Sequence, residues 1–252
     1  MFIDTHCHLT DKYAIETDSI IARANESGVK ALICATANPL DISGALELAQ
    51  KHQNLFVTIG IHPDYFDTDA NLYLTDEVLN NPRVVGVGEI GLDYHNGKTT
   101  RDSQIKLFEQ QLEIAQKHNI PVAIHTRDAE EDTASILTDK NFGVMHCFTS
   151  SWDLARIMLD RGFYFSASGI LTFKNAESIR ETFAKIPNDR IVIETDSPFC
   201  APVPYRGQKC EPYMVIETAK VLAQIINLQL DELETILYAN TTKLYKKCHV
   251  KL

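Results

Sequence analysis

The chain has 252 residues, of which 44% are hydrophobic and 23% charged, and this length suits either two small domains or one large α/β barrel. Its formal net charge of -10 argues against a protein that coats nucleic acid by bulk electrostatics. The charge does not exclude a nuclease, because such an enzyme can hold phosphate through bound metal ions and a few local cations.

Eight short apolar segments with β-strand character recur along the chain, and helical segments separate most of them. Strands that alternate with helices form a parallel sheet, and eight of them in this length favour a closed barrel over an open sheet. No linker-like or low-complexity tract marks a boundary, so we expect one domain over residues 1–252. The expected strands are Phe2 to His6, Ala31 to Thr36, Leu55 to His62, Val84 to Ile90, Pro121 to Thr126, Gly143 to Phe148, Phe163 to Ser168 and Ile191 to Asp196.

Between the fourth and fifth strands, apolar residues are spaced as one stripe of a helix that faces the core, and Asn119 and Pro121 end this helix. The acidic run 128–132 is typical of a first helical turn, where negative charge is favoured. Asp231 with Glu234 three residues later predicts the start of an extra C-terminal helix. The residues of the stripe are Ile105, Phe108, Leu112 and Ala115.

Neither a membrane span nor a secretion signal is expected. No apolar run approaches the ~18 residues of a spanning helix, and no basic segment precedes an apolar core at the amino terminus. The six cysteines are scattered without a CxxC pair, which indicates free thiols in a reducing compartment. We therefore expect a cytoplasmic monomer without an obligate protein partner.

Polar side chains that can bind metals fall at the carboxyl ends of the expected strands. His6 and His8 lie two residues apart, so strand alternation points both imidazoles to one face and turns Cys7 away. By the same rule, Cys147 points away from His146 and is not counted as a ligand. Each residue alone would more often be a hydrogen-bonded strand end, but one shared rim indicates the active site of an α/β barrel. The six residues are His6, His8, Glu89, His125, His146 and Asp196.

Four imidazoles and two carboxylates exceed the needs of one four-coordinate ion, so we expect a pair of divalent ions. Nitrogen and oxygen donors without thiolate favour zinc, manganese or magnesium, and the histidines disfavour magnesium in at least one position. Two ions bridged by a carboxylate can polarise a phosphoryl oxygen and lower the pKa of a bound water.

The chain resembles the TatD-type metal-dependent deoxyribonucleases over nearly its whole length. The resemblance rests on FIDTHCHL, GIHP, GEIGLDY, PVAIHTRDA, MHCFTSS, FSASGILTFKNA, IETDSPFCAPVPYRG and NTTKLY, which occur in family order. It implies a TIM barrel of the amidohydrolase-like superfamily that hydrolyses phosphodiester bonds of DNA with a metal-activated water, as a 3′–5′ exonuclease or repair-type enzyme. It also implies one ion on His6, His8 and Asp196, a second ion on His125 and His146, and Glu89 as the bridge between them.

Asp196 is expected both to ligate a metal and to take a proton from the attacking water, because a carboxylate that faces two cations stays ionised. Glu194 lies two residues earlier and is expected to orient a ligating histidine by a hydrogen bond. His62 could touch substrate, orient a ligand or merely pack beside Pro63. Phosphate contacts are expected from Arg206, Lys174 and Arg127, although a solvated charge is the commoner case at such positions. We expect His52, His95, His118 and His249 to lie at the surface.

Two positions depart from the family's usual pattern. Cys210 stands where the family usually has asparagine, and this puts the hydrogen bonding of a substrate loop in question, because a thiol replaces an amide poorly. Ser150 stands where glycine is usual, and we expect it only to stiffen a turn.

Two other functions stay open. An amidohydrolase acting on a small cyclic amide or lactone would share the HxH start. However, amidohydrolases that bind two ions are expected to bridge them with a carboxylated lysine on the fourth strand, where this chain has Glu89. A metal-binding scaffold without turnover is the other alternative. The complete ligand set argues against it, since a retired site would tolerate the loss of a member. Fold alone does not decide among these functions.

Overall fold

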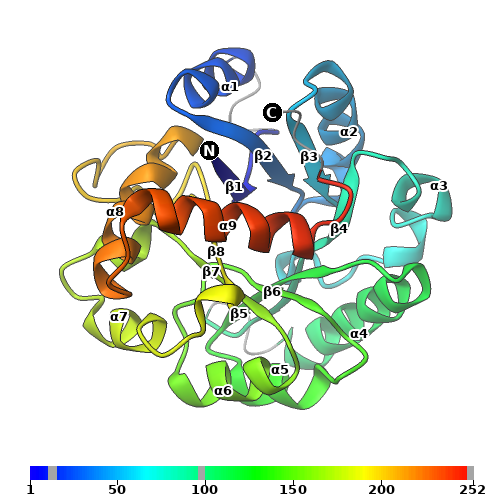
Figure 1. Ribbon diagram of the computed structural model, residues 1–252. Helices are drawn as coiled ribbons and strands as arrows, with labels where there is room; N and C mark the ends of the chain where they lie inside the picture. Colours follow the sequence, from blue (N-terminus) through cyan, green and yellow to red (C-terminus); the bar gives the residue numbers. More distant parts are fainter. Residues whose placement is uncertain (11–15, 96–99, 249–252) are drawn as a thin grey trace.

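The computed structural model describes residues 1–10, 16–95 and 100–248, so His249, which was expected at the surface, lies outside the described residues. Eight parallel strands form one sheet in the order β1 to β8, which curls into a barrel inside a ring of helices (Figure 1). The strands are β1 (Phe2–Cys7), β2 (Val29–Ala35), β3 (Leu55–Thr58), β4 (Val84–Asp93), β5 (Val122–Arg127), β6 (Gly143–Met145), β7 (Tyr164–Ala167) and β8 (Ile191–Ile193).

The barrel closes between β1 and the chain that follows β8. The backbone N–H of His8 donates to the carbonyl of Ser197 over 2.7 Å, and the N–H of Asp196 donates to the carbonyl of His6 over 2.9 Å. Cys7 and Ser197 form a parallel bridge at the same place. The expected TIM barrel is therefore confirmed, and its closing seam carries three of the candidate metal ligands.

Each strand is followed by a helix, and one further helix comes at the end, as expected. Among the described residues, no helix is both long and apolar enough to cross a lipid bilayer. The helices are α1 (Thr17–Glu26), α2 (Ile42–Lys51), α3 (Asp76–Leu79), α4 (Arg101–His118), α5 (Glu130–Ile136), α6 (Trp152–Asp160), α7 (Glu177–Phe183), α8 (Val215–Ile225) and α9 (Leu230–Leu244).

Three strands end three or four residues earlier than the sequence suggested, and after two of them, β6 and β8, the backbone turns out of the sheet. Cys147 and Asp196 have left-handed φ angles of 42° and 59°, which an extended strand cannot contain. The candidate residues after these strands therefore lie in the first turns of the loops at the carboxyl rim. The observed ends are Thr58 rather than His62 for β3, Met145 rather than Phe148 for β6, and Ile193 rather than Asp196 for β8.

Helix α4 buries the expected stripe against the barrel, with Phe108, Leu112 and Ala115 fully covered and Ile105 half-buried. It ends at Asn119, whose left-handed φ of 50° stops the helix as expected.

The same face of α4 also buries two glutamines. The Gln111 amide accepts from the N–H of Ile61 over 2.8 Å and donates to its carbonyl over 3.0 Å. Gln104 pairs in the same way with the backbone of Asp93, over 2.9 and 2.8 Å. The two amides supply hydrogen bonds to buried backbone groups that have no partner in a neighbouring strand. Helix α4 therefore holds two segments of the carboxyl rim in place.

Helix α9 begins at Leu230, earlier than the Asp231–Glu234 pair suggested. Gln229 is its N-cap, and the backbone N–H of Gln229 donates to the Glu232 carboxylate over 3.1 Å. The capping box therefore starts two residues before the expected one, with a glutamine in the capping position.

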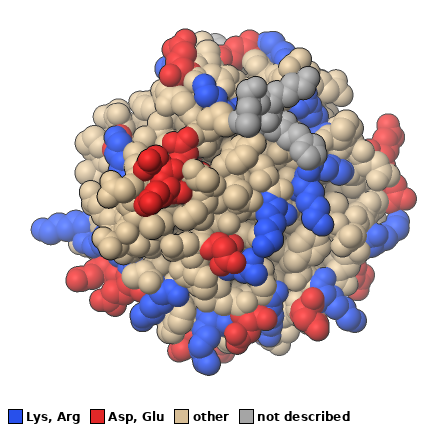
Figure 2. Space-filling view, viewed as in Figure 1, with Lys and Arg blue, Asp and Glu red and all other residues tan. Residues whose placement is uncertain are grey.

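The end of α9 closes the amino-terminal mouth of the barrel. The helix crosses this end in Figure 1, and Leu244, Tyr245 and Cys248 join the inward-facing residues of the strands in one buried cluster. Figure 2 shows that acidic and basic side chains are interspersed on this face. The carboxyl rim with the candidate ligands lies at the opposite end.

The plug at Tyr245 generates a stability prediction. The ring is fully buried and its hydroxyl has no partner among the described residues. We expect Tyr245→Ala to lower the free energy of unfolding by about 3 to 5 kcal/mol, because the cavity it leaves cannot collapse. Tyr245→Phe should change it by less than about 1 kcal/mol, because no protein hydrogen bond is lost. Urea unfolding followed by circular dichroism measures both values, and an equal loss in both variants would contradict this packing.

Candidate metal centre

Glu89 lies at the middle of the candidate site, on β4, with 4% of its surface exposed. Its Oε1 is 2.8 Å from Nδ1 of His125 and 3.3 Å from Nε2 of His146. Its Oε2 is 3.5 Å from Nε2 of His6 and 3.6 Å from Nε2 of His8. Each carboxylate oxygen thus faces a different pair of imidazoles, which is the arrangement of a bridging carboxylate.

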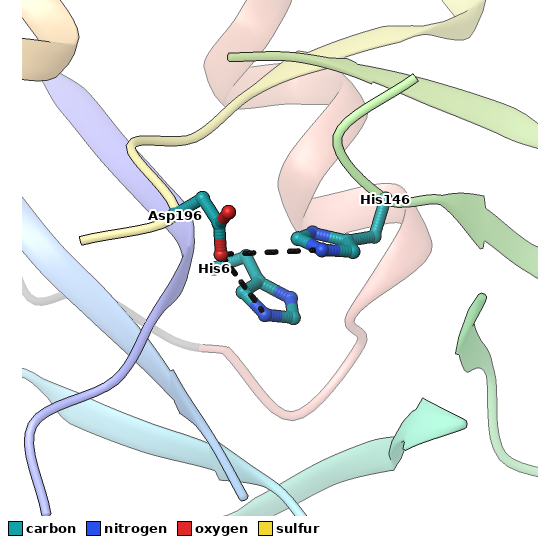
Figure 3. Close-up of side chains that lie close together, drawn as sticks. All are labelled: His6, His146 and Asp196. Atoms are coloured by element: carbon teal, nitrogen blue, oxygen red, sulfur yellow. Dashed lines mark ion pairs between the residues drawn. The ribbon is translucent and has the colours of Figure 1, made fainter. Parts of the chain in front are cut away.

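Asp196 faces the same imidazoles from the loop after β8. Its Oδ1 lies 4.0 Å from Nε2 of both His6 and His146 (Figure 3). The same oxygen lies 3.5 Å from Nε2 of His8. The rings of His6 and His146 are stacked with centroids 3.7 Å apart. The structure therefore brings together all six residues that the sequence singled out at the rim.

A hydrogen bond and an ion pair behind the site orient two of the histidines. Nδ1 of His8 lies 3.1 Å from the carbonyl oxygen of Ala35, and because a carbonyl only accepts, this nitrogen carries the proton. Nδ1 of His146 lies 2.8 Å from Oε1 of Glu194, which is the distance of an ion pair, but the contact lacks the geometry of the expected hydrogen bond. Both contacts leave Nε2 directed at the centre as a lone-pair donor.

The charges of the site are mutually dependent. Burial raises the pKa of the Glu89 carboxyl, but His146, His125 and His6 outweigh it and hold this pKa well below its ordinary value. Burial lowers the pKa of His125, yet Asp93 and Glu89 raise it to about 9. In the described chain, every ion pair of Glu89 and Asp196 runs to a histidine. The imidazoles around Glu89 therefore hold its carboxyl group in the ionised form.

These residues fit divalent metal ions. Donor atoms of His6, His8 and Glu89 lie within 4.8 Å of one another, and so do those of Glu89, His125 and His146. The two groups share Glu89, and all their donors are nitrogen or oxygen, which suits zinc or manganese. Arrangement and donor type together match a pair of ions with one bridging carboxylate.

Asp93 is a site residue that the sequence reading missed. Its Oδ2 is 3.2 Å from Nε2 of His125, and with His62 these residues form a further group of donors. The His62 ring lies 4.7 Å from that of His125, and its Nε2 is 3.8 Å from Oε1 of Glu89. The signal was present, because Asp93 follows Glu89 by four residues in one strand and alternation places both on one face.

Asp4 was also missed, although it precedes His6 by two residues on the same strand. It is fully buried, and it accepts hydrogen bonds from the backbone N–H groups of His6 and Thr195 and from the hydroxyl of Thr195. Burial raises the pKa of the Asp4 carboxyl to about 8 against these three bonds. Asp4 thus ties β1 to the loop that carries Asp196.

A cavity of about 620 Å³ opens above the centre. Arg127 and His62 are among its lining residues, whereas Arg206 and Lys174 are not. The Arg206 guanidinium lies 3.8 Å from the centroid of the Phe173 ring, and Lys174 is exposed to solvent. Of the three cations expected to contact phosphate, Arg127 is therefore the one that lines the cavity.

The expectation that Cys147 points away from His146 and the rim is wrong. This residue lines the cavity, and its sulfur lies within 4.8 Å of donor atoms of Asp196 and Cys200. Strand alternation does not apply, because β6 ends at Met145 and the φ of 42° at Cys147 turns its side chain back toward the rim. Cys7, which stays within β1, does point into the core as expected.

Cys210 lies away from the cavity. It is buried against Ala201 and Met214, and its backbone N–H donates to the carbonyl of Pro198 over 3.1 Å. The cysteine that replaces the family's usual asparagine therefore affects packing behind the loop that follows β8, rather than hydrogen bonds to substrate. Ser150 is half-buried and precedes Ser151, the N-cap of α6.

The histidines expected at the surface differ in exposure. His95 is exposed, as expected, and its Nδ1 lies 2.9 Å from Asp128. His52 and His118 are half-buried instead, because each packs against a carboxylate, Asp18 for His52 and Asp76 for His118.

Comparison with known proteins identifies close relatives. The family model described as TatD related DNase matches residues 3–246. A Bacillus subtilis protein named uncharacterized metal-dependent hydrolase YabD is 36% identical, over 98% of this chain and 99% of its own. The Escherichia coli protein named uncharacterized metal-dependent hydrolase YcfH is 34% identical over 96% and 95%. The crystal structure of YJJV, a TatD homologue from Escherichia coli, is 28% identical, superposes with a TM-score of 0.90 and covers 97% of this chain and 98% of its own.

The contact between Glu194 and His146 generates a prediction on metal affinity. Glu194→Gln keeps the size of the side chain but removes the charge that orients His146, so the affinity for zinc should fall by about 10- to 100-fold. The number of ions bound at saturation should not change. Competition with a chromogenic chelator measures the affinity, and Glu181→Gln, on the exposed face of α7, is the matched control. Equal affinities in the two variants would contradict the orienting role.

Proposed function

The chain belongs to the TatD-related DNase family, whose relatives are named metal-dependent hydrolases, and on this premise we propose that it cleaves phosphodiester bonds of DNA with two divalent ions. The proposed activity is that of a 3′–5′ exonuclease or a repair-type deoxyribonuclease. The observation that carries the proposal is the position of Glu89, whose two oxygens face separate pairs of histidines. When bound there, two ions would supply a Lewis acid for the phosphoryl oxygen and a water of lowered pKa.

Asp196 has the position and charge of a proton acceptor. Burial raises the pKa of its carboxyl, but His8, His146 and His6 outweigh it and hold this pKa below the ordinary value. The side chain lines the cavity, so a water above the centre lies within its reach. An ionised carboxylate at the mouth of the centre can take the proton of the attacking water, while the buried Glu89 stays a ligand.

The cavity has features that suit a nucleotide chain. Phe199 and Tyr65 line it with 47% and 38% of their surfaces exposed, and aromatic faces of this kind stack on bases without sequence preference. Arg127 lines the same cavity and supplies a cation for a phosphate. A small cyclic amide or lactone would need neither the two rings nor the cation, so these residues favour a nucleic-acid strand.

Replacing Asp196 tests the proposal. Single-stranded, duplex and abasic DNA are assayed beside a panel of small amides and lactones, with and without chelator. We expect cleavage of DNA that stops in excess chelator, and a single-turnover rate at least about 100-fold lower for Asp196→Asn with DNA binding retained. Asp160→Asn, at the exposed end of α6, removes the same charge away from the cavity and should cleave normally. Turnover of amides or lactones with intact DNA would refute the proposal.

The rim cations lead to a prediction on salt dependence. Binding of a short single-stranded oligonucleotide should weaken by about 0.7 logarithmic units per tenfold salt for each phosphate contact, and Arg127→Ala should remove about one contact. Arg206 and Lys174 lie outside the cavity lining, so Arg206→Ala and Lys174→Ala should lower the slope for longer strands only. Fluorescence anisotropy at several salt concentrations measures these slopes. A wild-type slope that implies many contacts would contradict binding centred on the metal ions.

A further inference from the structure

Two thiols lie beside the candidate metal centre. Cys147 and Cys200 are half-buried and line the cavity, whereas the other four cysteines are buried in the core. The sulfur atoms of Cys147 and Cys200 and a carboxylate oxygen of Asp196 lie within 4.8 Å of one another. These three residues are called the thiol cluster. Its two thiols have no role in the chemistry described above, whereas Asp196 also belongs to the histidine centre.

The backbone is built to bring these three side chains together. Each of them has a left-handed φ, 42° at Cys147, 59° at Asp196 and 54° at Cys200, a conformation that costs energy outside glycine. The N–H of Cys147 donates to Glu194 over 2.7 Å, which holds the first turn. Gly169 lets the second turn approach, because a Cβ there would lie 1.9 Å from the carbonyl oxygen of Cys200.

The two oxygens of Asp196 serve different neighbours. Oδ1 faces His6, His8 and His146, whereas Oδ2 lies 3.5 Å from Sγ of Cys200. A tetrahedral ion with a Zn–S distance of about 2.3 Å and a Zn–O distance of about 2.0 Å holds its two donor atoms about 3.5 Å apart. The pair formed by Oδ2 of Asp196 and Sγ of Cys200 therefore has the donor spacing of a zinc site, and it uses the carboxylate oxygen that does not face the histidines. The sulfur of Cys147 lies within 4.8 Å of this group.

We propose that Cys147, Cys200 and Asp196 form a third metal site, selective for a soft divalent ion such as zinc or cadmium, that shares Asp196 with the histidine centre. Two thiolates select such ions over manganese or magnesium, which prefer oxygen donors. Binding would release the two thiol protons to solvent, and a water from the open cavity would complete a four-coordinate shell. The site would tie Asp196 to a third ion. The protein would therefore bind one more ion of zinc than of manganese.

Cadmium titration of the reduced, metal-free chain tests this site, because cadmium absorbs in the ultraviolet when thiolates bind it. A centre of imidazoles and carboxylates alone gives no such charge-transfer band. We expect the band in the wild type, less than half of it in Cys147→Ala and in Cys200→Ala, and none in the double variant. Cys248→Ala, which removes a buried thiol at the opposite end of the barrel, is the control and should keep the full band.

Equilibrium dialysis against cadmium adds a count that is independent of nuclease activity. The double variant should bind one ion fewer than the wild type, and this difference persists even if the histidine centre takes fewer ions than proposed. Thermal melts show whether each variant is folded, and the two single variants report separately. A wild type without the band, or a band that survives in the double variant, would overturn the third site. Loss of the two thiols to a disulfide in air, with no band in reduced protein, would also overturn it.

Discussion

The site depends on the cost of burying the Glu89 carboxylate inside an apolar barrel. An isolated carboxylate in such a place would be strongly unfavourable, so it needs positive partners at short range. In the described chain these partners are imidazoles rather than lysine or arginine, which are too long and too firmly charged to be replaced by a metal ion. The histidines can give up their protons to solvent, and the same lone pairs then serve as ligands. One buried anion thus requires the cluster that makes the centre suitable for cations.

The surrounding fold keeps this cluster from relaxing. Asp4 ties β1 to the loop that carries Asp196, Glu194 stands behind His146, and the two buried glutamines of α4 hold segments of the rim. At the other end, α9 plugs the barrel, so the interior is packed and the polar groups gather at one mouth. The ligands come from strands far apart in sequence, and only closure between β1 and the β8 loop brings them together.

The alternation of strands and helices sufficed to predict the fold, and the position of the six residues at strand ends sufficed to predict that they converge, because the carboxyl ends of the strands meet at one rim of the barrel. His6 and His8 meet as their spacing predicted, with their Nε2 atoms 3.3 Å apart. The predicted direction of the Cys147 side chain was wrong, because a left-handed turn stands where the sequence suggested an extended strand. Asp93 lies on the face that strand alternation predicts, but it was overlooked beside Glu89. Cys210 was expected to affect the hydrogen bonds of a substrate loop, whereas its side chain packs behind that loop. Turns and loop packing depend on tertiary contacts that a sequence pattern does not contain.

The central claim is that Glu89 bridges two ions, each held by its own histidines. Crystals soaked in manganese, which the thiol cluster should not retain, allow a direct measurement by anomalous scattering. The account predicts two peaks about 3.5 to 4 Å apart, one between Glu89 Oε2 and the pair His6 and His8, the other between Glu89 Oε1 and the pair His125 and His146. A single peak at saturating manganese, or two peaks that Glu89 does not join, would contradict it.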